Sequence, residues 1–185
     1  MKKGDNMKKQ GFTIIEVILV LAIAGLIFLM MMIALPALQR QQRDTARKED
    51  IDRFIASVKK YQTNNRGALP TSVNDPNDPT SWYAFFKKYL SDGFEDPSSG
   101  DTYDWKVYSC GDTGSADSKC DNQEAMSAIE KATTQSFEDN DFGFYIIKGS
   151  KCSGDETTGV VKSSNPRKFS VLYKLEGGGL YCQDA

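Results

Sequence analysis

An uninterrupted apolar stretch near the N-terminus constrains this chain more than any other feature. Between Phe12 and Leu38 lie 27 residues, and Glu16 is the only charged one. As an α-helix, this stretch would rise roughly 40 Å at about 1.5 Å per residue, which exceeds the roughly 30 Å thickness of a bilayer's hydrocarbon core. The sequence beyond Leu38 is polar. The chain therefore divides into a membrane-compatible segment and a larger water-soluble part.

The residues around the start of this stretch argue against two simple interpretations. Lysines at positions 2, 3, 8 and 9 precede it, which predicts a cytoplasmic N-terminus and an exported body. A Sec signal has an apolar region of about 7–15 residues followed by a small-residue cleavage site. Here the apolar run is longer, and the small residue, Gly11, comes before it. A plain signal anchor leaves Glu16 unexplained, because an acidic side chain in a membrane costs about 1–3 kcal/mol.

The order of these features is specific: a basic leader, Gly11, the run Phe12-Thr13-Ile14-Ile15-Glu16, and the apolar helix. This order resembles the class III signal of type IV prepilins. The resemblance implies that a prepilin peptidase cuts between Gly11 and Phe12 and methylates the new amine of Phe12. It also implies that Glu16, the fifth residue of the mature chain, is the carboxylate used in assembly. The start codon is left open between Met1 and Met7.

Elementary electrostatics explains why a carboxylate at position 16 would serve assembly. Cleavage would create an α-amine on Phe12 that is largely protonated at neutral pH. Phe12 and Glu16 are four residues apart and share one face of a helix. In a low-dielectric filament core each charge needs a partner. A neighbouring subunit, shifted along the axis, can offer its amine to this carboxylate.

The resemblance implies a structural subunit of a type IV pilus, and a major pilin is favoured. Such a subunit waits in the cytoplasmic membrane and then polymerises with copies of itself into a surface filament used in adhesion or twitching motility. The implied partners are the prepilin peptidase, the assembly ATPase and the platform machinery. The alternatives are a minor pilin, a type II secretion pseudopilin, or a monomeric signal-anchored ectodomain.

The sequence predicts four segments: a leader (1–11), a transmembrane and filament-core helix (12–38), the amphipathic second half of that helix (39–64) and a globular head (65–185). The helix is expected to continue past Pro36, although proline favours a bend between Gly25 and Pro36. Apolar residues then recur at three- and four-residue spacing, which predicts a helix packed on a sheet. These residues are Ile51, Phe54, Ile55, Val58 and Tyr61.

The predicted fold is α+β, with the long helix packed on a small antiparallel sheet of about four strands. The long helix should end near residues 64–67, and a short aromatic helix at 82–90 would be capped by Thr80 or Ser81. Strands are expected at 103–109, 142–148, 168–175 and 180–182, with a weaker strand at 157–161. A capping box predicts a further helix over 121–134.

Four cysteines, all beyond the apolar stretch, indicate two disulfides in an oxidising space. Cys110–Cys120 with Cys152–Cys182 is favoured among the three pairings. The first bond closes a short loop, and the second resembles the C-terminal disulfide of many pilins. A zinc site would need four thiolates at irregular spacing.

Composition argues against an enzyme and against a cofactor. The chain has no histidine, which removes Ser-His-Asp and Cys-His arrangements, and it has no phosphate-binding glycine loop. Without the first eleven residues it has 19 basic and 24 acidic residues, so nucleic acid is not indicated as a partner, although a local basic patch is left open. The acidic pairs Asp139 with Asp141 and Asp155 with Glu156 match no calcium-binding loop, and no metal site is predicted.

Overall fold

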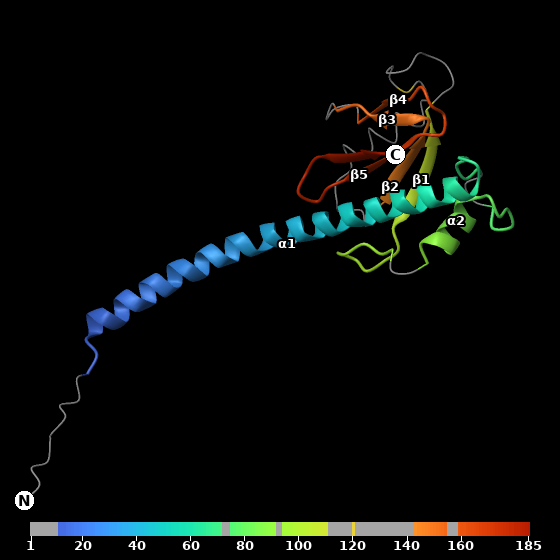
Figure 1. Ribbon diagram of the computed structural model, residues 1–185. Helices are drawn as coiled ribbons and strands as arrows, with labels where there is room; N and C mark the ends of the chain where they lie inside the picture. The colour runs from blue at the N-terminus through green and yellow to red at the C-terminus, as the bar shows by residue number, and fades with distance from the viewer. Residues whose placement is uncertain (1–10, 72–74, 92–93, 111–119, 121–142, 155–158) are drawn as a thin grey trace, which may run out of the picture. The chain divides into compact units, whose positions relative to one another are not determined.

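The computed structural model describes residues 11–71, 75–91, 94–110, 120, 143–154 and 159–185 (Figure 1). The helices are α1 (Ile14–Asn64) and α2 (Trp82–Tyr89). The strands are β1 (Asp104–Ser109), β2 (Gly143–Lys148), β3 (Ser150–Cys152), β4 (Val160–Lys162), β5 (Phe169–Lys174) and β6 (Leu180–Asp184). The chain forms two compact units, residues 1–39 and 40–185, and each is described by itself.

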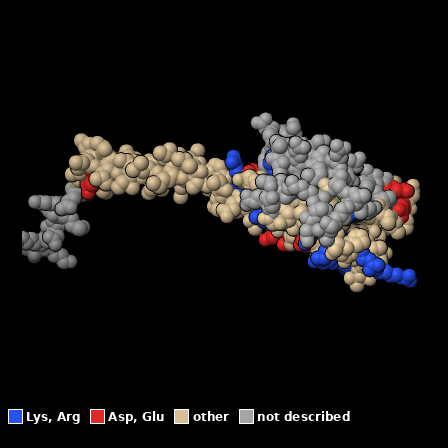
Figure 2. Space-filling model, turned by 90° about the horizontal axis from the view of Figure 1, so that it is seen from above, with Lys and Arg blue, Asp and Glu red and all other residues tan. Residues whose placement is uncertain are grey.

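In the first unit, α1 runs through Gly25 and Pro36 without a break. Pro36 has no N–H to donate, so the helix lacks one hydrogen bond there. Every residue from 11 to 39 is exposed, and the surface of the apolar stretch is almost free of charge (Figure 2). By length and composition, this part of α1 can cross a membrane.

In the second unit, the remainder of α1 buries one side against the head. The buried positions of this part recur at intervals of three or four residues, as expected of an amphipathic helix. The helix ends at Asn64, where the sequence predicts its end. The buried side chains of α1 are those of Asp44, Arg47, Ile51, Phe54, Ile55, Val58 and Tyr61.

The α+β class predicted from the sequence is confirmed, with a four-stranded sheet in the order β1-β2-β5-β6 and a separate two-stranded ribbon, β3-β4. One pairing differs from the all-antiparallel expectation: β1 and β2 are parallel, with Val107 opposite Ile146. A parallel pair needs a crossover of a dozen or more residues, and residues 110–142 are long enough to supply one. The other pairings are antiparallel.

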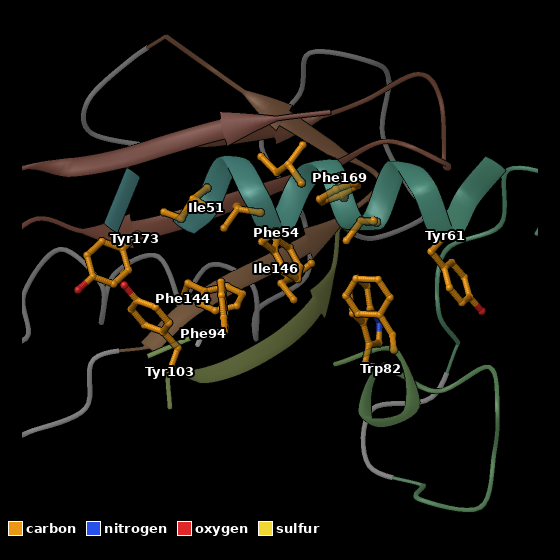
Figure 3. Packing of buried hydrophobic residues seen from close by; sticks show 14 residues of the cluster. Ile51, Phe54, Tyr61, Trp82, Phe94, Tyr103, Phe144, Ile146, Phe169 and Tyr173 are labelled. Atoms are coloured by element: carbon orange, nitrogen blue, oxygen red, sulfur yellow. The ribbon is translucent and has the colours of Figure 1, made fainter. Parts of the chain in front are cut away.

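One face of the sheet packs against α1 and α2, and Phe54 lies at the centre of this core (Figure 3). Its side chain is fully buried and its ring lies 5.0 Å from that of Phe144 and 5.6 Å from that of Phe86, centroid to centroid. Helix α2 adds Trp82 and Phe85, also fully buried or nearly so. Ser81 caps α2 by accepting a 3.1 Å hydrogen bond from the Ala84 N–H.

The opposite face of the sheet has a smaller core. Ile147, Val160 and Leu172 pack there with the disulfide between Cys110 and Cys120. A second disulfide, Cys152–Cys182, joins β3 to β6. This is the pairing favoured from the sequence, and each bond is expected to stabilise the head by about 2–4 kcal/mol. The helix expected over 121–134 lies outside the described residues.

The packing around Phe54 predicts a large effect of truncation. Phe54→Ala should lower the free energy of unfolding by about 3–5 kcal/mol, because it removes a fully buried ring from a rigid aromatic core. Denaturant unfolding of the full chain in detergent, followed by tryptophan fluorescence, measures this. Tyr83→Ala is the matched control at a 45% exposed position, with an expected change of about 0.5 kcal/mol or less. Equal losses in the two variants would contradict this description of the core.

Candidate functional site

The segment from Gly11 to Glu16 forms the start of α1. Phe12 is 88% exposed and Thr13 directly precedes the first helical residue. Oε2 of Glu16 accepts hydrogen bonds from the backbone N–H of Thr13 at 3.2 Å and from its hydroxyl at 3.1 Å. The hydroxyl oxygen of Thr13 in turn accepts a 3.4 Å hydrogen bond from the N–H of Glu16. These bonds satisfy polar groups at the start of a helix that otherwise lack partners.

This arrangement is a capping box, with Thr13 as the N-cap and Glu16 three residues later. Sequence reasoning identified Glu16 and overlooked the role of Thr13, although the spacing T-x-x-E before an apolar run is the signal for it. The box directs one carboxylate oxygen of Glu16 back to its own chain. Among the residues with described coordinates, no group donates a hydrogen bond to the other oxygen, Oε1.

Within the head, a cluster of ionised side chains surrounds Arg47, which is 1% exposed. Its guanidinium donates two parallel hydrogen bonds to Asp96, from Nε to Oδ2 at 2.7 Å and from Nη2 to Oδ1 at 3.0 Å. Nη2 also donates to Ser98 at 3.0 Å, and Nη1 donates to Glu176 at 3.1 Å. A bidentate arginine–carboxylate pair is both strong and geometrically specific.

Asp44 joins the same cluster to the turn between β5 and β6. Its carboxylate accepts hydrogen bonds from the backbone N–H groups of Glu176 at 2.9 Å and Gly177 at 2.8 Å. A Cβ atom at Gly177 would lie 3.1 Å from Oδ2 of Asp44, so a larger residue would crowd this approach. The side chain of Arg43 adds a 2.8 Å hydrogen bond from Nε to Glu176. We call these residues, Arg43, Asp44, Arg47, Asp96 and Glu176, the charged cluster.

Two carboxylates of the charged cluster, those of Asp96 and Glu176, have lowered pKa values. Burial by itself raises the pKa of Asp96, but hydrogen bonds from Arg47 and Ser98 outweigh it and leave the pKa below its ordinary value. The hydrogen bond from Arg43 lowers the pKa of Glu176, against a smaller opposing effect of burial. Nearby Asp50 differs: burial raises its pKa, despite a hydrogen bond from the Tyr103 hydroxyl at 3.0 Å.

The charged cluster ties α1 to two segments that are distant in sequence, the loop at 94–98 and the turn at 176–177. The sequence patterns did not connect either segment to the helix. The sequence did contain a signal for this contact. Asp44 and Arg47 extend the three- and four-residue spacing of the buried apolar residues of α1 toward the N-terminus. Charged residues at core-facing positions predict buried partners. The acidic pairs at 139 and 141 and at 155 and 156 lie outside the described residues.

The lowered pKa values predict that the head loses stability in acid. A carboxylate with a folded pKa below its unfolded value stabilises fully above the unfolded value, near 4, and progressively less as pH falls through the folded value. The free energy of unfolding should therefore fall between about pH 5 and pH 3. Asp50, with a raised pKa, acts in the opposite direction and offsets part of this loss.

Asp96→Asn tests the assignment to the charged cluster. It should cost about 3–5 kcal/mol at pH 7, because Arg47 would remain buried without its main counter-ion, and it should flatten the stability profile between pH 5 and pH 3. Denaturant titrations at several pH values measure both effects. Asp101→Asn, at an exposed position, is the control and should keep the wild-type profile. An unchanged profile in Asp96→Asn would contradict the role assigned to this residue.

Comparison with known proteins adds one finding. Residues 6–32 match a family model described as "Prokaryotic N-terminal methylation motif". Neither a curated protein nor a solved structure matches the chain. The matched region contains Gly11, Phe12 and Glu16 and most of the exposed apolar part of α1. The chain therefore carries the class III signal peptide of type IV pilins, followed by the long apolar helix that such a signal precedes.

Proposed function

We propose that the mature chain is a structural subunit of a type IV pilus, and that it is a major pilin. The observation on which this rests is the exposed apolar surface of residues 12–38, most of which lies within the methylation motif. Exposing an apolar surface of this size to water is energetically unfavourable and rare in soluble monomeric proteins. A bilayer before assembly and the helices of other subunits after assembly are the two environments that would cover it.

Processing between Gly11 and Phe12 is the first step. A prepilin peptidase would remove the basic leader and methylate the amine of Phe12. The exposure of Phe12, at 88%, and the absence of any described contact around Gly11 leave the bond open to a membrane peptidase. Four positive charges leave with the leader, so the new N-terminus is held in the membrane by its apolar helix rather than by lysines.

Pairing between the Phe12 amine and Glu16 would set the register of assembly. Apolar helices packed side by side slide easily, since their contacts are similar at many offsets. A buried amine and a buried carboxylate in adjacent subunits permit few offsets, because any other leaves two charges unpaired. Oxygen Oε1 of Glu16 is available for such a contact while Oε2 remains bonded to Thr13.

The head would form the outer surface of the filament, with its disulfides formed after export. Lysines before the apolar stretch favour a cytoplasmic N-terminus and an exported head. Growth would require the assembly ATPase and platform proteins in the cytoplasmic membrane. Adhesion and twitching motility are both functions of such filaments.

Substitutions at Glu16 can separate its two roles. Glu16→Gln retains an N3 side chain that can close the capping box but has no charge, and Glu16→Ala removes both. If assembly depends on the carboxylate, both variants should be exported, cleaved and methylated but should form no filaments. Electron microscopy of sheared surface material and mass spectrometry of the mature N-terminus measure these outcomes. Normal filaments from Glu16→Gln would show that helix capping, not charge pairing, is what assembly needs.

The same preparations distinguish the related alternatives. A major pilin should be the most abundant protein of sheared wild-type filaments. A minor pilin would be a trace component, and a pseudopilin would give processed protein without long surface filaments. A mature chain that still begins with its leader would favour a signal-anchored ectodomain and would refute the proposal.

A further inference from the structure

A hollow of about 530 Å³ opens on the head between the end of α1 and the segment that precedes β5. Four cationic side chains line it, and among the described residues that line it there is no acidic and no aromatic side chain. The polar residues that matter most are Lys59, Gln62, Arg66, Asn165, Arg167 and Lys168. Ala185 also lines the hollow.

The four cations of this hollow lie at positions 59, 66, 167 and 168. None of them forms an ion pair with any residue in the described part of the chain. The arginines of the charged cluster, by contrast, are fully paired. Four such cations in one hollow repel each other, so the hollow favours an anion.

Arg66 has a left-handed backbone at the end of α1, where glycine would be the unstrained residue. The N–H of Gly67 donates a 2.7 Å hydrogen bond to the carbonyl of Gln62, which is the bond of a Schellman motif. In that motif the preceding residue is left-handed and is usually glycine. Here Arg66 occupies it, with φ at 56°. Strain of this kind at a side chain that lines a hollow points to a function of the side chain.

The second arginine is fitted against the same helix end. A Cβ atom at Gly67 would lie 3.1 Å from Nη1 of Arg167, so glycine at this position leaves room for the guanidinium. The side chain of Gln62 donates a 2.8 Å hydrogen bond to the carbonyl of Arg167. Residues about 100 positions apart in the sequence are thus held together on one wall.

We propose that this hollow binds phosphate groups carried on an anionic polymer. Guanidinium groups match phosphate oxygens with paired N–H donors, and lysines add positive charge without geometric demands. The hollow is open rather than enclosed, which suits groups presented along a chain. The lack of an aromatic platform in its lining means that phosphates, and not stacked bases, are the recognised groups.

The test uses the full-length chain in zwitterionic detergent and inorganic polyphosphate as the titrant. The double variant Arg66→Gly with Arg167→Gln should weaken binding about tenfold, and salt should weaken wild-type binding strongly. The matched control, Lys87→Gln with Lys88→Gln, removes the same charge from exposed positions on α2 and should bind as wild type. Arg66→Gly alone should melt at or above the wild-type temperature, which separates lost binding from lost folding.

Several results would overturn the proposal: no binding of polyphosphate, equal weakening in the α2 control, or equally tight binding of polyglutamate, whose carboxylates lack the phosphate geometry. Duplex DNA in a parallel competition identifies the source of the phosphate. If duplex DNA displaces polyphosphate, the ligands include phosphodiester backbones. If it does not, the site is restricted to polyphosphates that lack a sugar backbone. The measurement uses unassembled protein, so it is independent of whether the chain forms a pilus.

Discussion

The head depends on how one side of α1 changes along its length. From Ile51 to Tyr61 this side is apolar and fills the core between the helix and the sheet. Two turns earlier the same spacing places Asp44 and Arg47 at the head, where apolar partners give way to polar loops. A buried guanidinium requires counter-ions with good geometry, and Asp96 and Glu176 provide them from two separate segments.

Buried ion pairs of this kind add little net stability compared with apolar residues of the same size. Their value lies in selectivity, because any other placement of the loops would leave Arg47 buried without a partner. The aromatic core around Phe54 supplies the burial energy, and the charged cluster restricts which loops can meet the helix. The apolar and the charged parts of the buried side of α1 thus have different effects, although they lie on one continuous helix face.

Much of this structure followed from local sequence. The end of α1, helix α2 and the four sheet strands were predicted within a few residues, because each depends on side-chain periodicity and nearby turn residues. The parallel pairing of β1 with β2 was not predicted, since strand direction depends on the path of the intervening 33 residues (110–142). Ribbon strand β3 was also missed, because three residues are too short for a period to be recognised. In the candidate site, the sequence identified Glu16 but overlooked its bonds to Thr13.

The sequence by itself determined the N-terminal part: an apolar helix with one acidic residue behind a basic leader and a glycine. These features act within one helix and its first turn, so their order in the chain is their order in space. Tertiary structure alone decided the charged cluster and the hollow near Arg66. Their members come from positions as far apart as 47 and 176, or 66 and 167, and only the fold brings them together. Net charge averages over the whole chain, which is why a mildly acidic composition gave no sign of four cations that line one hollow and form no ion pair with any described residue.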